Sequence, residues 1–222
     1  MKIKAVIFDL DGTLLNTLNS INHFLCKTLG EYGFGEVTLE QTKYFVGEGA
    51  ARLVVRALEH QGYDVSKNEK KLKDITARYV SDYNNNPKHL TTPYKGIPKL
   101  ISELLKRGYK LGVVSNKPDP TVKSLVKDFF GDSFGFVLGG REGIKLKPSA
   151  DMPLMACHEL SVLPSEVMYV GDTSTDMKTG KAFGAGITVG VSWGFRDSDE
   201  LWANGAEEVV DEPCRILKLL ES

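Results

Sequence analysis

The chain has few cysteines and no long apolar run. Its 222 residues include only Cys26, Cys157 and Cys214, and no two of them have the C-x-x-C spacing of a metal or redox site. We therefore expect reduced thiols and a cytoplasmic protein rather than a secreted disulfide scaffold. No stretch approaches the roughly 20 apolar residues that a spanning helix needs. The apolar run at residues 5–8 is also too short for a signal peptide.

An excess of either charge is also missing. The chain has 28 Lys and Arg against 29 Asp and Glu, which leaves a formal net charge of -1. This balance predicts neither nucleic acid nor an anionic membrane as a partner. With 41% hydrophobic residues, the chain is long enough for a substantial core in one or two domains. The sequence does not distinguish a monomer from a homodimer.

Short β-branched runs alternate with helical patterns along most of the chain. The predicted strands are residues 3–9, 110–116, 134–140, 167–172 and 186–194, with a further short one in "EEVVDEP". The predicted helices between them are residues 96–108, 120–131, 149–161 and 174–184. Such alternation is typical of right-handed βαβ units. We therefore expect an α/β fold with a mainly parallel, Rossmann-like sheet.

One segment breaks this alternation. Residues 15–91 contain helical patterns with almost no strand signal, and Thr38 has the position of a helix N-cap. We therefore predict a core domain formed by residues 1–14 and 92–222, with a helical domain of residues 15–91 inserted after the first strand.

Polar residues follow the predicted strands. Asp9 and Asp11 end the first strand, Ser115 and Asn116 end the second, and Asp172 ends the fourth. Asp176 follows one helical turn later, and Lys145 and Lys147 precede the helix before that strand. Ligands of open parallel sheets bind beyond the carboxyl ends of the strands. We expect these groups to meet there.

Each of these features also has a purely structural interpretation. Asp-x-Asp-Gly is a common turn sequence, Ser115 and Asn116 could cap a helix, and Asp172 and Asp176 suit a helix N-terminus. Their recurrence at successive strand ends nevertheless favours a shared site.

The accumulated negative charge indicates the chemistry. Asp9, Asp11 and Asp172 would repel one another and any anionic substrate, which a Mg²⁺ ion would relieve. Lysine and Ser or Asn donors suit phosphate oxygens, and a carboxylate can carry a phosphoryl group transiently. The rigid strand end favours Asp9 as the nucleophile and leaves proton transfer to Asp11. We expect Gly12 to let the turn present N–H groups to the phosphate.

The segments "DLDGT" (9–13), "SN" (115–116), "KP" (147–148) and "GDTSTD" (171–176) resemble the four ordered motifs of the haloacid dehalogenase superfamily. The resemblance spans the chain and implies a Rossmann-like core with a helical cap inserted after the first strand, and a Mg²⁺-dependent phosphatase. Its nucleophile would be Asp9 and its general acid/base Asp11. It also implies metal ligation by Asp9, the Asp11 carbonyl and Asp172, support from Asp176, and phosphate binding by Ser115, Asn116 and Lys147.

Within this superfamily the chain is most similar to phosphoglycolate phosphatases, through "TTPYKGIPKLISELLKRGYKLGVVSNKPD" and "VGEGARLVVRAL". A small phosphorylated metabolite is therefore the expected partner. In the predicted cap, Gly47, Glu48, Gly49 and Arg52 are candidate substrate-binding residues, because an arginine can pair with a small carboxylate. A sugar phosphomutase of the β-phosphoglucomutase type and a pyrophosphatase are alternatives on the same core. A dehalogenase normally lacks the second aspartate.

Overall fold

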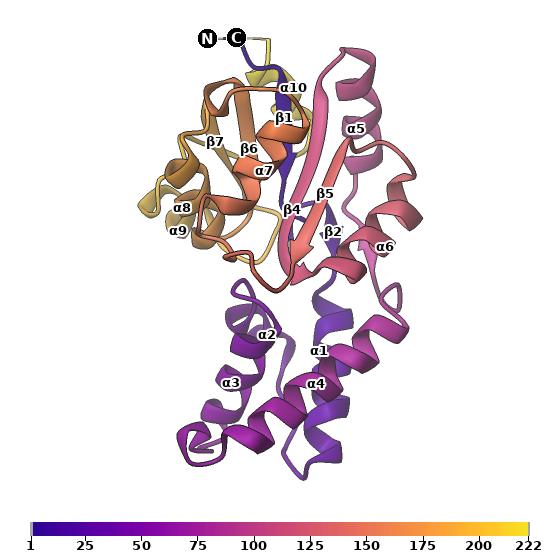
Figure 1. Cartoon of the computed structure of the whole chain (residues 1–222), viewed down its shortest axis with the longest axis vertical. Coiled ribbons are helices and arrows are strands. Elements are labelled where there is room, and N and C mark those ends of the chain that lie inside the picture. The colour runs from indigo at the N-terminus through magenta and orange to yellow at the C-terminus, as the bar shows by residue number, and fades with distance from the viewer. Residues whose placement is uncertain (1, 222) are drawn as a thin grey trace. The chain divides into compact units, whose positions relative to one another are not determined.

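The computed structural model of this protein describes residues 2–221, and it forms two compact units (Figure 1). One unit combines the chain up to Asn16 with the chain from Pro93 onward, and the other is Thr17–Thr92. The sequence pattern predicts borders after residues 14 and 91, which lie two residues and one residue before those of the compact units. Two short strands, β2 (Leu15–Asn16) and β3 (Thr92–Pro93), pair where the chain passes between the units.

The first unit is built on a six-stranded sheet with the order β5-β4-β1-β6-β7-β8. All five pairings are parallel, which confirms the predicted α/β class. The strands are β1 (Ala5–Phe8), β4 (Lys110–Pro118), β5 (Phe136–Gly140), β6 (Val167–Gly171), β7 (Ile187–Val191) and β8 (Glu208–Val210).

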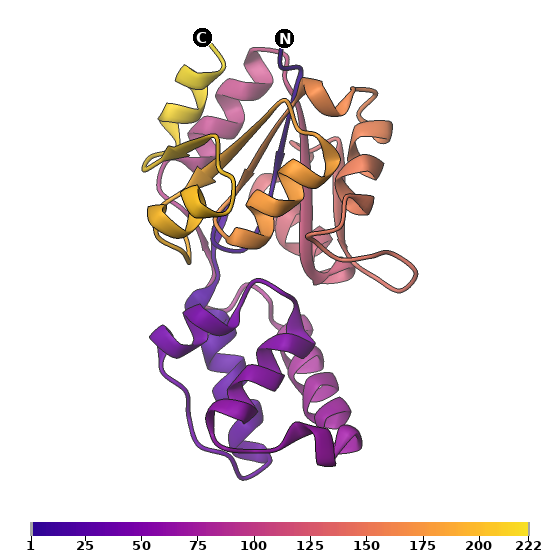
Figure 2. The same ribbon diagram turned by 90° about the vertical axis from the view of Figure 1, so that its left-hand side faces the viewer.

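Helices cover both faces of this sheet (Figure 2). Val6 and Phe8 of β1 pack into one core with α5 (Ile97–Lys106), α6 (Asp119–Phe130) and α10 (Cys214–Leu219). Ala5 and Ile7 point to the other face, toward α7 (Asp151–Glu159) and α8 (Ser174–Phe183). All four residues of β1 are fully buried, as expected of a strand covered on both faces. A short 3₁₀ turn (Pro164–Glu166) precedes β6, and α9 (Ser198–Ala203) follows β7.

The position of β1 in the middle of the sheet determines where a binding site is expected. From β1 the sheet grows through β4 and β5 in one direction, and the chain then returns to form β6, β7 and β8 on the other side. This reversal leaves a topological switch point beside β1, and ligands of doubly wound sheets bind at such points.

The second unit contains only helices among its longer elements: α1 (Leu18–Glu31), α2 (Leu39–Phe45), α3 (Ala50–His60), α4 (Glu69–Asn85) and a 3₁₀ turn (Val65–Lys67). Thr38 is the N-cap of α2, as predicted, because its hydroxyl accepts the Gln41 N–H while the Gln41 side chain accepts the Thr38 N–H. Helices α1 and α4 also pack together, with Phe24 edge-on to Tyr83 and Lys27 paired with Asp82.

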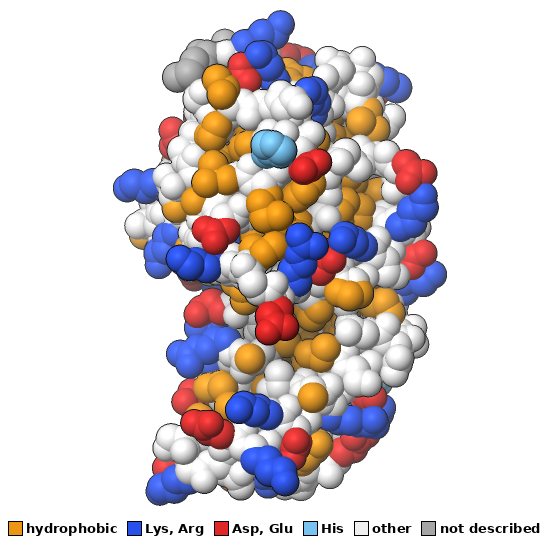
Figure 3. All heavy atoms as spheres, in the orientation of Figure 1, with side chains coloured by type: hydrophobic (Ala, Val, Ile, Leu, Met, Phe, Trp, Pro, Cys, Tyr) orange, Lys and Arg blue, Asp and Glu red, His pale blue; other side chains and the backbone are white. Residues whose placement is uncertain are grey.

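Charges of both signs are interspersed over the face seen in Figure 3, as the balanced composition suggests. In residues 2–221 no helix has the length and apolar character needed to cross a bilayer.

Two glycines within helices allow the effect of packing on stability to be measured apart from the effect of helix propensity. A Cβ on Gly180 in α8 would overlap with Oγ1 and Cγ2 of Thr188, whereas one on Gly30 in α1 would meet no atom within 4 Å. We expect Gly180→Ala to destabilise the protein by about 1–3 kcal/mol through overpacking. The matched Gly30→Ala variant should gain about 0.5–1 kcal/mol from helix propensity. Differential scanning calorimetry measures both, and stabilisation by Gly180→Ala would contradict the packing.

Candidate active site

The carboxyl ends of β1 and β6 bring together a group of buried charges. Asp9 follows β1 and Asp172 follows β6, while Asp176 lies in the first turn of α8. One carboxylate oxygen of each residue lies within 4.8 Å of the others. Asp172 and Asp176 are fully buried, and Asp9 is 7% exposed.

One cation lies in this group. The Lys147 ammonium is buried and lies 2.7 Å from Asp176 Oδ1 and 2.8 Å from Asp9 Oδ1. The Asp9 oxygen has this ion pair but no hydrogen bond of normal geometry. Three carboxylates against one ammonium leave two negative charges uncompensated when all are ionised. The donor set therefore fits a hard divalent cation, for which carboxylate oxygens are the preferred ligands.

The titration of these groups reflects the unbalanced charge. Burial, together with the nearby Asp176 and Asp11, raises the pKa of Asp9 to about 7, although Lys147 opposes the shift. Burial, Asp176 and Asp9 raise the pKa of Asp172 well above its usual range. Asp176 and Asp9 raise the pKa of Lys147 despite its burial, so this lysine stays charged.

Asp172 is held by two hydrogen bonds and two glycines. Its Oδ1 accepts the Thr13 hydroxyl at 3.0 Å, and its Oδ2 accepts the Phe195 N–H at 2.8 Å. A Cβ on Gly12, which has φ +83°, or on Gly194 would overlap with the Asp172 side chain. The N–H of Gly12 itself donates to the Leu15 carbonyl, so the N–H groups that this turn is expected to present to a phosphate are those of neighbouring residues. Gly12 also leaves room for the Asp172 side chain.

Asp176 also has the structural role that the sequence left open. Its Oδ2 accepts both the N–H and the hydroxyl of Thr173, and Thr173 in turn accepts the Asp176 N–H, which forms a capping box for α8. Its other oxygen binds Lys147 and lies 3.4 Å from the hydroxyl of buried Tyr169. Asp176 thus ties the start of α8 to the lysine.

Asn116 positions the lysine loop. Its side-chain oxygen accepts the Lys147 N–H at 2.8 Å, and its side-chain nitrogen donates to the Lys147 carbonyl at 3.0 Å. This pair of bonds joins the end of β4 to a loop 31 residues later. Ser115, which is 2% exposed, accepts the Lys117 N–H through its hydroxyl oxygen. Lys145, the other lysine that the sequence offered, is not among the partners of the acidic group.

Asp11 belongs to a separate ion pair. The Lys117 ammonium lies 3.1 Å from both of its carboxylate oxygens. Both side chains are largely buried, at 18% exposure for Asp11 and 8% for Lys117. The Asp11 carboxylate is not part of the three-carboxylate group.

The candidate residues of the helical unit lie near the start of α3. Gly47 and Gly49 have φ values of +117° and +88°, which favour glycine. Glu48 forms an ion pair with Arg56, whose guanidinium also donates to the Phe45 carbonyl. Arg52 is exposed on α3.

Sequence reasoning assigned no role to several residues that shape this site. Lys117 stands directly after the Ser-Asn motif, and this position was its only signal. Thr13 and Thr173 lie within the motif segments 9–13 and 171–176, so their side chains could have been considered as supports. Trp193 follows β7, and its indole N–H donates to the Thr13 carbonyl at 3.1 Å.

A family model described as haloacid dehalogenase-like hydrolase matches residues 6–190. The chain belongs to the haloacid dehalogenase-like hydrolases. This confirms the family that the motifs indicated, and with it an enzyme of the hydrolase class.

The similar proteins align with this chain over nearly its whole length. It is 28% identical to a phosphoglycolate phosphatase of Haemophilus influenzae, over 99% of both chains. It is 34% identical to one of Rhodospirillum rubrum, over 94% of this chain and 87% of the relative. A crystal structure from Lactobacillus delbrueckii subsp. bulgaricus, provisionally named a phosphoglycolate phosphatase, superposes with a TM-score of 0.93 at 30% identity over 99% of both chains. The expected similarity to phosphoglycolate phosphatases is confirmed.

The charge imbalance predicts how Asp172→Asn changes stability. The raised pKa means that the folded state binds more protons than the unfolded state, so this carboxyl destabilises the metal-free protein increasingly as pH rises above its ordinary value of 3.8. An asparagine could keep both hydrogen bonds, because its amide can donate to the Thr13 hydroxyl and accept the Phe195 N–H.

In EDTA we therefore expect Asp172→Asn to melt at a higher temperature than the wild type near pH 8 and at a similar one near pH 4. Each 1 kcal/mol corresponds to about 2–4 °C in a protein of this size. Mg²⁺ should stabilise the wild type more than the variant. A difference in melting temperature that is independent of pH would contradict the unbalanced charge.

Proposed function

We propose that the protein is a Mg²⁺-dependent phosphatase of small phosphate monoesters, which acts through a phosphorylated Asp9. The observation that carries this proposal is the buried group of Asp9, Asp172 and Asp176 with the single cation Lys147. Asp9 and Asp172 would hold the ion with the Asp11 carbonyl, and Asp176 would support the site. When bound, Mg²⁺ supplies positive charge that lets the phosphate approach these carboxylates and orients it.

Asp9 suits the nucleophile because it directly follows β1, which fixes it, and because the Lys147 ammonium orients one of its oxygens. This carboxylate forms a new P–O bond while the ester P–O bond breaks, and protonated Asp11 gives its proton to the leaving oxygen. Ionised Asp11 then takes a proton from water as the water oxygen attacks phosphorus, which releases phosphate and restores Asp9. Lys117 lies 3.1 Å from both carboxylate oxygens of Asp11 and can hold this side chain in position for both steps.

The remaining residues bind and orient the phosphate. Lys147 can donate to a phosphate oxygen while it remains beside Asp9. Ser115 accepts a hydrogen bond through its oxygen, so its proton can be donated to the phosphate. For Asn116, the hydrogen bonds to Lys147 support a positioning role in addition to any contact with phosphate.

For the substrate we propose 2-phosphoglycolate, with the helical unit as a cap that selects it. The support is the full-length similarity to phosphoglycolate phosphatases and the exposed Arg52, whose guanidinium suits the glycolate carboxylate. A relative from Pseudomonas aeruginosa that is 27% identical over the full chain is an N-acetylmuramic acid 6-phosphate phosphatase, so this sugar phosphate is the second candidate.

Phosphate release from p-nitrophenyl phosphate tests the reaction class. We expect activity that requires Mg²⁺ and falls at least about 10³-fold in Asp9→Asn, because an amide cannot replace the nucleophile. The control Asp132→Asn removes a carboxylate of an exposed side chain and should keep full activity. Unchanged activity in Asp9→Asn would refute the mechanism.

Asp11→Asn tests the proton transfer separately. An alkyl ester such as 2-phosphoglycolate needs a proton on its leaving oxygen, whereas p-nitrophenolate leaves without one. We therefore expect the first step with the alkyl ester to slow by about 10²–10⁴-fold, and with the aryl ester much less. Rapid-quench measurement of the first turnover compares the two esters, and equal losses would argue against Asp11 as the general acid.

A substrate panel tests the specificity. We expect a higher kcat/KM for 2-phosphoglycolate than for N-acetylmuramic acid 6-phosphate, glucose phosphates or pyrophosphate. Arg52→Gln should raise KM for 2-phosphoglycolate by about tenfold and leave p-nitrophenyl phosphate unaffected, since a lost charge-assisted bond costs roughly 1.5 kcal/mol. Lys70→Gln, which removes an exposed charge from α4, is the matched control. Equal turnover of the panel would refute phosphoglycolate as the preferred substrate.

A further inference from the structure

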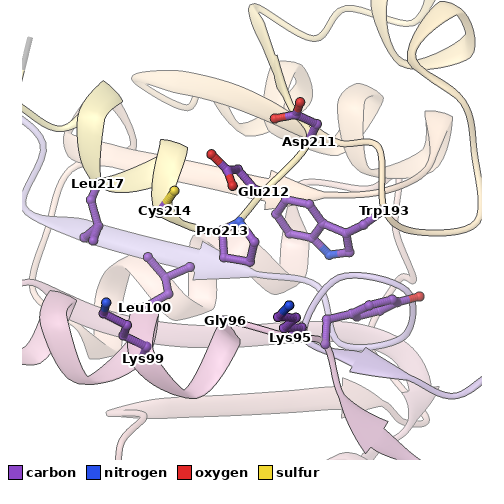
Figure 4. A pocket seen from close by; sticks show the side chains of 11 residues that line it. Lys95, Gly96, Lys99, Leu100, Trp193, Asp211, Glu212, Pro213, Cys214 and Leu217 are labelled. Atoms are coloured by element: carbon purple, nitrogen blue, oxygen red, sulfur yellow. The ribbon is translucent and has the colours of Figure 1, made fainter.

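The sheet-containing unit has a pocket of about 430 Å³ outside the group of buried carboxylates (Figure 4). It is formed by the start of α5, with Lys95 and Lys99, and by the connection from β8 to α10, with Pro213. Trp193, from the segment after β7, also lines it. Neither Asp9, Asp11, Asp172 nor Lys147 does.

Three of the residues that line the pocket have rings. The indole of Trp193 and the ring of Pro213 lie next to each other in Figure 4, and Tyr94 also lines the pocket. Tyr94 and Trp193 pack against the hydrophobic core, so their rings are supported from behind. A Cβ on Gly96 would contact Pro213 at 3.4 Å, which shows how closely α5 approaches the opposite wall. A narrow space between supported rings favours a planar ligand.

The charges around the pocket favour an anion. Asp211 and Glu212 are acidic, but the Arg215 guanidinium lies 3.0 Å from Asp211 and 3.9 Å from Glu212. Lys95 and Lys99 are exposed, and neither is within ion-pair distance of a carboxylate in residues 2–221. Arg215 offsets one of the two acids. Lys95, Lys99 and Arg215 together carry three positive charges against the two negative charges of Asp211 and Glu212, which leaves a net charge of +1 around the pocket.

We propose that this pocket is a second binding site, which takes a planar aromatic anion and acts on the metal site through Trp193. The aromatic ring stacks between Trp193, Tyr94 and Pro213, and the anionic group pairs with Lys95 and Lys99. The volume lies within the roughly 300–1,000 Å³ of small-molecule sites.

A short chain of contacts connects the pocket to Asp172. The Trp193 indole N–H donates to the Thr13 carbonyl, and the Thr13 hydroxyl donates to Asp172 Oδ1. A ligand that stacks on the indole changes how Trp193 holds Thr13, and Thr13 in turn orients the carboxylate. Coupling between two sites is reciprocal, so a ligand that alters Mg²⁺ affinity is itself bound differently when Mg²⁺ is present. This coupling rests on the Mg²⁺ site proposed above, whereas the binding itself does not.

Isothermal titration calorimetry with naphthalene-2-sulfonate, on the full chain in EDTA, tests the binding. We expect saturable binding at one site that weakens at least about tenfold in the Lys95→Gln/Lys99→Gln variant. The control variant Lys178→Gln/Lys181→Gln removes two exposed lysines from α8 and should bind like the wild type. Hexane-1-sulfonate, which lacks the ring, and 2-naphthylmethylammonium, which has the opposite charge, should bind at least tenfold more weakly.

Absence of binding, equal losses in the two double variants, or equal affinity for hexane-1-sulfonate would overturn the site. None of these measurements needs phosphatase activity, so their failure is distinguishable from failure of the proposed function.

Titration of Mg²⁺ with and without saturating naphthalene-2-sulfonate tests the coupling. We expect the Mg²⁺ dissociation constant of the wild type to change at least twofold. In Trp193→Phe, which keeps a ring but loses the N–H donor, naphthalene-2-sulfonate should still bind and the Mg²⁺ dissociation constant should not respond to it. An unchanged Mg²⁺ dissociation constant in the wild type, or the same response in Trp193→Phe, would overturn the coupling.

Discussion

The contact of Lys147 with Asp9 and Asp176 makes the buried acidic site tolerable. Without this ammonium, three carboxylates would face one another with almost no water to screen them. Burying a charge is costly unless it is paired. The lysine itself is buried at a corresponding cost, which the two carboxylates offset. The cation and the acids are therefore interdependent, and the loss of either would leave the other unpaired.

The backbone around the site is arranged to keep these charges in place. Asn116 bonds to both backbone groups of Lys147, Thr173 holds Asp176, and Thr13 holds Asp172. These supports come from the ends of different strands, and the parallel sheet is what brings them to one edge. Gly12 and Gly194 let the backbone approach Asp172 more closely than any other residue would allow. The packing of the sheet thus determines the electrostatics of the site, because it sets the distances between the charges.

Much of the fold was predictable because buried parallel strands leave a strong pattern. "AVIF" and "VMYV" are continuous apolar runs. Asp9 directly follows the first run, and Asp172 lies two residues after the second. The helical insert was recognisable because strand signals stop after residue 15. The role of Gly12 was not predictable in the same way. A glycine at positive φ fits both a turn that exposes N–H groups and a close approach by another segment, and the close approach of Asp172 is visible only in the tertiary structure. The pairing of Asp11 with Lys117, 106 residues apart in the chain, also depends on the order of β1 and β4 in the sheet.

Trp193 shows how a packing residue can gain a second role at such an edge. Its ring completes the hydrophobic core beside Tyr94, which is a sufficient reason for a large side chain at this position. A phenylalanine would serve that purpose equally well, but it could not donate to the Thr13 carbonyl. The indole nitrogen therefore connects the packing of the core to the hydroxyl that orients Asp172. The coupling proposed between the pocket and the metal site depends on these two hydrogen bonds, because they are the contacts that join the indole to the Asp172 carboxylate.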